Sequence, residues 1–192
     1  MGFLRNLLAL VGAIAVAGGL YAYTKLGPVI AEFDPGATDM YRGFAEQLIK
    51  HKDPGVAMMW QVEVEEGISV EDVKESLKSL AAARNFLFVG EAPFYKQVQA
   101  VTGKPFRHVE FLSFCDARVG AMMADYRDEY TGFMPCRVSI VEGKDGKIRL
   151  FSMNLDMMIY GGKALPPELK SEALRVSKII QEIMQGAAQG EF

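Results

Sequence analysis

The chain has little of what enzymes and nucleic-acid-binding proteins commonly use. Two histidines and two cysteines occur among its 192 residues. It contains no HExxH, CxxC or CxxCH motif, no paired-cysteine zinc pattern and no P-loop. A formal net charge of −3 leaves no excess of positive charge to neutralise a phosphate backbone, so nucleic acid is not an expected partner. These absences favour a binding protein over an enzyme, and no catalytic residue or metal site is predicted.

The N-terminus carries the longest apolar run of the chain. Residues 7–23 contain no charged side chain, and as a helix they would cover about 25 Å, close to the apolar thickness of a bilayer. Tyr21 and Tyr23 fall where aromatic side chains meet a membrane interface. We therefore predict a single transmembrane anchor at 1–27 that contacts lipid through residues 7–23.

A cleaved signal peptide is the alternative to a retained anchor. Arg5 supplies a positive charge, residues 7–14 an apolar region, and Ala15-Val16-Ala17 a small-residue cleavage pattern. With either a retained anchor or a cleaved signal peptide, the rest of the chain is expected to be exported across the membrane. Arg5 favours a cytoplasmic N-terminus, although Lys25 beyond the run opposes it. The expected location is the inner membrane, single-pass, with the domain on the periplasmic side.

The remaining chain predicts one α+β domain with a mixed, partly antiparallel sheet and packed helices, preceded by one transmembrane helix. Gly27-Pro28 is expected to break the anchor helix, residues 28–38 to form a linker, 39–186 the domain, and 187–192 a flexible tail. Helices are expected at 39–50, 70–84, 93–101, 117–126 and 168–184, and strands at 56–65, 86–89, 107–114, 137–142 and 147–153. The last two strands flank Gly143-Lys144-Asp145-Gly146, a strong hairpin signal.

Cys115 ends one predicted strand and Cys136 begins the next. If those strands are antiparallel neighbours the two thiols can meet, whereas a parallel crossover would separate them. A structural disulfide, two buried free thiols and a redox or metal-binding pair are the three readings. Asp116 would raise the pKa of Cys115 and Arg137 would lower that of Cys136, which makes Cys136 the better thiolate candidate.

Methionines and a charged segment offer two further candidates. Met122 and Met134 with the two cysteines would form a soft-metal or haem-axial site, although methionine more often simply fills a core. Residues 125–129 form a charged run flanked by Tyr126 and Tyr130, with Arg127 between them, in the segment 125–132. This segment is either a solvated loop or a docking loop.

Four short stretches carry a family resemblance. Phe114-Cys115-Asp116 is followed by residues 134–138 (MPCRV), Glu142 and residues 145–148 (DGKI). With these stretches the chain resembles the domain-of-unknown-function 302 family over roughly residues 56–163. The resemblance implies a compact α+β sandwich of a sheet with helices, often self-associating. It implies no reaction, substrate or catalytic residue.

The expected function is a membrane-anchored periplasmic accessory or binding module that docks on a larger membrane complex, such as a respiratory or redox complex. The alternative is a redox or haem/copper-binding protein that uses Cys115 and Cys136. A homo-oligomer with a structural role is a third reading. No cofactor is predicted in the first case, and haem or copper in the second.

Overall fold

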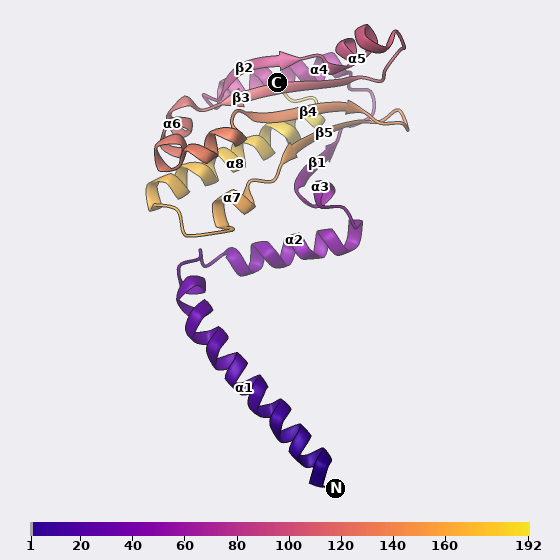
Figure 1. Cartoon of the computed structure of the whole chain (residues 1–192). Helices are drawn as coiled ribbons and strands as arrows, with labels where there is room; N and C mark the ends of the chain where they lie inside the picture. The colour runs from indigo at the N-terminus through magenta and orange to yellow at the C-terminus, as the bar shows by residue number, and fades with distance from the viewer. Residues whose placement is uncertain (1) are drawn as a thin grey trace.

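An apolar helix and an α+β domain make up the molecule (Figure 1). The structure is a computed structural model and describes residues 2–192. The long helix α1 (Gly2–Ala31) projects away from the domain, and α2 (Ala37–His51) lies between α1 and the rest of the domain. The other helices are α3 (Pro54–Ala57), α4 (Val70–Ala83), α5 (Phe94–Thr102), α6 (Ala117–Tyr126), the 3-10 helix η1 (Asp128–Phe133), α7 (Asp156–Tyr160) and α8 (Pro167–Ala188).

One five-stranded sheet organises the domain. Its strands are β1 (Met59–Glu63), β2 (Leu87–Ala92), β3 (Val109–Cys115), β4 (Cys136–Glu142) and β5 (Ile148–Met153), in the spatial order β1-β5-β4-β3-β2. Every neighbouring pair is antiparallel. The predicted α+β class is confirmed, and the sheet is antiparallel throughout where a mixed one was expected. The helical connections around β3 are long enough for either direction, so their length did not decide it.

The core lies between one face of the sheet and helices α4 and α8. Alternate strand residues supply the sheet side, among them Leu112, Phe114, Val138, Ile140 and Leu150, all fully buried. Helix α8 supplies Ile180, Ile183 and Met184. Burying one such side chain contributes about 1.5–3 kcal/mol, so this face holds most of the domain's stability.

Local signals fixed several element ends as predicted. Ser69 begins α4 in a capping box, in which its hydroxyl accepts from the Asp72 amide at 3.1 Å and the Asp72 carboxylate accepts from the Ser69 amide at 3.1 Å. Asp116 caps α6 by accepting from the amides of Arg118 and Val119. The β4–β5 hairpin closes where Gly146 adopts a φ of +78°, a left-handed conformation that glycine enters without steric cost.

The predicted ends of the first and last helices are wrong, and the strand expected at 56–65 is shorter, because Pro54–Ala57 form α3 and β1 begins at Met59. Helix α1 continues through Pro28 to Ala31, because one missing amide removes a single helical hydrogen bond and long apolar helices tolerate that loss. The tail predicted to be flexible from residue 187 instead prolongs α8, where Ala187 and Ala188 are buried. The Glu191 amide then donates to the Gly186 carbonyl at 2.9 Å, so the chain end packs on the domain.

The segment predicted as a linker is a fixed corner between α1 and the domain. Phe33 forms a β-bridge with Lys163, and the Asp34 amide donates to the Gly162 carbonyl at 2.8 Å. The Asp34 side chain is 1% exposed, ion-pairs with Lys170 and accepts from the Gly36 amide at 2.8 Å. We call residues 32–36 with Lys163 and Lys170 the corner. It ties α1 to the segment before α8.

Replacing Asp34 tests the corner. Burial would raise the pKa of Asp34, but the hydrogen bonds from Lys170 and the Gly36 amide lower it overall. Asp34→Asn removes the charged pair and should lower the free energy of unfolding by about 1–3 kcal/mol at pH 7. Because the folded-state pKa is lowered, the pair stabilises at neutral pH and is lost as pH falls below about 4. The difference from wild type should therefore shrink in acid.

Urea unfolding of the full chain at pH 7 and at pH 3 measures both effects. The exposed residue Asp125 provides the control, and Asp125→Asn should change stability by less than about 0.5 kcal/mol. An Asp34→Asn variant as stable as this control at pH 7 would show that the corner is only a loose connection.

Candidate functional site

Two cysteines and three methionines line one cavity of about 60 Å³ at the end of the sheet. Cys115 ends β3 and Cys136 begins β4, and the antiparallel register pairs Phe114 with Cys136. The other sulfur residues are Met123 on α6, Met134 after η1 and Met158 on α7. We call this space the sulfur cavity. Its remaining lining residues are Phe86, Asp116, Val119, Gly120, Phe133, Leu155, Ile159, Ala173 and Val176.

The antiparallel strands bring Cys115 and Cys136 to this one cavity, as the sequence predicted for that topology. Both are free thiols in the structure. Gly120 on α6 separates Cys115 from Met134. A Cβ atom at Gly120 would lie 3.3 Å from the Met134 Sδ atom and 3.6 Å from the Cys115 Sγ atom. The absence of a side chain at Gly120 therefore leaves the space between these two sulfur atoms open.

The surroundings of both thiols favour the protonated form. Burial raises the pKa of Cys115, and the Asp116 carboxylate raises it further. Burial, followed by the neighbouring Cys115, raises the pKa of Cys136 to about 11. The prediction that Arg137 lowers the pKa of Cys136 is wrong, because successive strand residues point to opposite faces. The Arg137 guanidinium lies 5.4 Å from the centre of the Phe111 ring instead.

Of the two methionines predicted to lie beside the cysteines, one lines the sulfur cavity. Met134 lines the sulfur cavity as predicted, but on α6 Met123 does so in place of Met122. Helical spacing puts residues 119, 120 and 123 on one face and carries residue 122 off it. Met158 was missed because α7, which presents it, was not expected. The cavity volume of about 60 Å³ is well below the roughly 300 Å³ or more of pockets that hold ligands of drug size.

The predicted docking segment is a folded aromatic cluster next to the sulfur cavity. The Tyr126 and Tyr130 rings lie 5.8 Å apart between centres, and the Arg127 guanidinium lies 5.7 Å from the Tyr126 ring. Both tyrosines pack against the core. Phe133 lies 6.3 Å from Tyr130, lines the cavity and is 48% exposed. The segment therefore presents an apolar surface at the cavity wall.

Comparison with known proteins identifies the domain. Residues 60–187 match the family model described as "Domain of unknown function DUF302". The chain belongs to the DUF302 family. It is similar to an uncharacterized protein of Aquifex aeolicus (strain VF5), with 29% identity over 126 residues that cover 65% of this chain and 81% of the relative.

A solved structure shares the DUF302 fold. The crystal structure of an uncharacterized conserved DUF302 protein from Bacillus stearothermophilus superposes with a TM-score of 0.54 at 17% identity. The match covers 67% of this chain and 96% of that chain. The family match begins at Trp60, so α1, α2 and residues 32–36 of the corner lie outside the matched DUF302 region, whereas Lys163 and Lys170 lie inside it.

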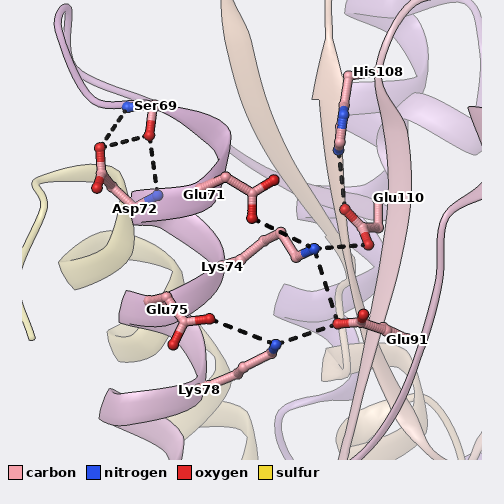
Figure 2. A network of polar contacts seen from close by, with 9 residues as sticks. All are labelled: Ser69, Glu71, Asp72, Lys74, Glu75, Lys78, Glu91, His108 and Glu110. Carbon is pink, nitrogen blue, oxygen red and sulfur yellow. Dashed lines mark hydrogen bonds and ion pairs between the residues drawn. The ribbon is translucent and has the colours of Figure 1, made fainter.

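A network of charged side chains, separate from the sulfur cavity, lies inside the DUF302 domain between α4 and the sheet (Figure 2). Glu110 on β3 is 2% exposed. One of its carboxylate oxygens lies 3.1 Å from the Lys74 Nζ atom, and the other lies 3.1 Å from the His108 Nε2 atom. Figure 2 also shows Glu91 on β2, whose carboxylate lies 4.0 Å from Lys74 and 3.3 Å from Lys78.

This buried network was missed from the sequence, although one signal was present. Glu110 occupies a core-facing position in the alternation that continues with Leu112 and Phe114. A charge there requires a partner, and Lys74 on α4 provides it. Burial would lower the pKa of Lys74, but its hydrogen bond to Glu110 and the nearby carboxylates raise it overall. Both Glu110 oxygens are engaged, so the network joins α4 to β3.

Removing one partner of this network should cost more than removing both. Glu110→Gln leaves the largely buried Lys74 without its nearest charge and should lower the free energy of unfolding by about 3 kcal/mol. Lys74→Met combined with Glu110→Leu replaces the pair by apolar volume and should cost less than Glu110→Gln. Urea unfolding gives these values, with Glu75→Gln as the exposed control. A double variant less stable than Glu110→Gln would contradict this account.

The raised pKa values predict slow thiol alkylation. Iodoacetamide at pH 7 should modify both cysteines more slowly than in the urea-unfolded chain, because the thiolate is the reactive form. The rate should rise about tenfold per pH unit above 7. Cys115 should react before the more deeply buried Cys136. Peptide mass spectrometry over time measures each site, and faster modification of Cys136 would show that its thiolate is stabilised.

Proposed function

We propose that the protein is a single-pass membrane protein whose DUF302 domain, on the periplasmic side of the inner membrane, serves as an accessory module that docks on a larger membrane complex. The observation that carries this proposal is the exposure of α1. None of its described residues, Gly2–Ala31, is buried by the domain, and its most apolar 18-residue window has a mean hydropathy of 1.8. Water is a poor solvent for such a surface, and lipid would cover it.

The charges on α1 fit a bilayer. Arg5 and Lys25 bracket an uncharged stretch of about 28 Å, close to the roughly 30 Å apolar thickness of a membrane. Arg5 supports a cytoplasmic N-terminus, and Lys25 at the other end weighs against it. The remaining turns of α1, from Lys25 to Ala31, would continue beyond the apolar layer to the corner.

A smooth strip on α1 supports docking to another membrane helix. Nothing lies within 4 Å of a Cβ atom built on Gly12, Gly18 or Gly19. Small residues let two helix backbones approach closely in lipid, where helix association depends on packing. The corner holds this helix to the domain, so one partner would meet both α1 and the domain.

Thiol chemistry is the weaker alternative. The two free cysteines of one cavity suit a dithiol couple, but the raised pKa values of both make them poor attacking thiols at neutral pH. A haem-binding role is disfavoured by the size of the sulfur cavity. A disulfide between Cys115 and Cys136 stays a prediction.

Membrane extraction and partner purification test the proposal. The full chain should stay in membranes after alkaline carbonate washing, and external protease should degrade its domain only in spheroplasts. Ile14→Lys should weaken membrane retention, because a charge at the centre of the span costs about 3 kcal/mol. Ile49→Lys, the same change at an exposed site on α2, should be retained like wild type.

Purification in mild detergent should then recover a membrane-protein partner. Gly18→Leu with Gly19→Leu should keep membrane retention and lose that partner, since the bulk prevents close helix approach. A chain that runs alone in every mild detergent, or a domain protected in spheroplasts, would contradict the proposal.

A further inference from the structure

The sulfur cavity offers an unusual concentration of soft donors. Five sulfur atoms come from five separate elements or connections, namely the ends of β3 and β4, α6, the turn after η1, and α7. The neighbouring methionines Met122 and Met157 do not line it. Thiolate and thioether ligands select cuprous copper over the harder cations.

Hard cations find little to bind in this cavity. Among the described residues that line it, Asp116 is the one with a charged side chain. Its carboxylate is engaged by the Arg175 guanidinium and by the amides of Arg118 and Val119 at the start of α6. Among the same lining residues there is no imidazole, which is the ligand that zinc and cupric ions commonly use. The side chains that line the cavity therefore favour a soft cation over a hard one.

The space also fits an ion better than a molecule. A volume of about 60 Å³ holds one ion with its ligands moving slightly inward, and is small for an organic ligand. Gly120 keeps the gap between Cys115 and Met134 open, because a Cβ there would contact both sulfur atoms. An alanine is otherwise favourable at this position, since Gly120 lies inside α6 and alanine raises helix stability.

We propose that the sulfur cavity binds a single cuprous ion through Cys115, Cys136 and Met134. Met123 and Met158 complete a soft, apolar surrounding. Binding forms copper–sulfur bonds and releases thiol protons to solvent, with no transfer of electrons and no change in the oxidation state of copper. The site requires both cysteines reduced. It goes beyond the docking role, which needs no metal.

Anaerobic titration with Cu(I) buffered by bicinchoninate tests the proposal on the full chain in detergent, reduced with a phosphine. One Cu(I) per chain is expected to bind. Cys115→Ser and Cys136→Ser should each weaken the affinity by about tenfold or more, since even residues that only support a ligand are worth about that much. Met134→Leu should weaken it less.

Gly120→Ala tests the shape of the cavity most directly, because it fills the space between two sulfur atoms and removes neither of them. It should weaken Cu(I) binding, because its methyl group fills the gap between Cys115 and Met134, and the melting temperature of the apo-protein measures the cost of moving Met134. Met122→Leu and Met157→Leu change methionines next to the site and should bind as wild type does. Less than one Cu(I) per chain in the wild type would overturn the proposal, as would Gly120→Ala and Cys115→Ser variants that bind like these controls. Neither outcome touches membrane retention, so failure here is distinguishable from failure of the docking role.

Discussion

The register of β3 against β4 is the constraint on which both the Glu110 network and the sulfur cavity depend. Pairing of Phe114 with Cys136 and of Glu110 with Ile140 puts these four side chains on the core face. Because side chains alternate along a strand, a slip of β4 by one residue would turn its whole set over. Arg137 would then enter the core, and Cys136 would leave the sulfur cavity. The apolar residues between the two ends of this strand pair hold that register.

The two ends of the β3–β4 pair have opposite chemistry. At one end Glu110 is buried with two partners, Lys74 and His108, so its charge is compensated by nearby groups. At the other end Cys115 and Cys136 lie among mostly apolar side chains, and burial, with Asp116 beside Cys115, raises the pKa of both thiols. Leu112 lies between these ends and is fully buried. One strand pair therefore separates a buried network of charged side chains from a mostly apolar, sulfur-lined cavity within the same core.

Local patterns predicted the elements of this fold better than their ends and contacts. The start of α4 at Val70 and the hairpin around Gly146 rest on neighbouring residues, and both were found where the sequence put them. The DUF302 family and the α+β class were also predicted. Direction within the sheet depends on how α6 and η1 return the chain, and no short pattern records that path. The lowered pKa expected for Cys136 failed because neighbours in a strand sequence point to opposite faces.

Contacts between distant segments explain the remaining differences. Asp34 reads as a turn residue, and only the fold shows that Lys170 lies beside it. Glu110 was missed although it is a charge in an apolar alternation, and its partner Lys74 could not be chosen among the lysines without the packing of α4 on β3. The sulfur cavity combines both kinds of information. Its cysteines followed from strand order, while Met158 required the unexpected helix α7.

The corner also sets how the domain would search for a partner. A long flexible tether lets a domain sweep a large volume, and its local concentration near any one partner falls accordingly. Here the bridge of Phe33 with Lys163 and the buried Asp34 hold the domain at the end of α1. For an anchored chain the search reduces to lateral diffusion and rotation about one axis. In such an anchored chain the corner would exchange reach for a high effective concentration at a single height above the lipid.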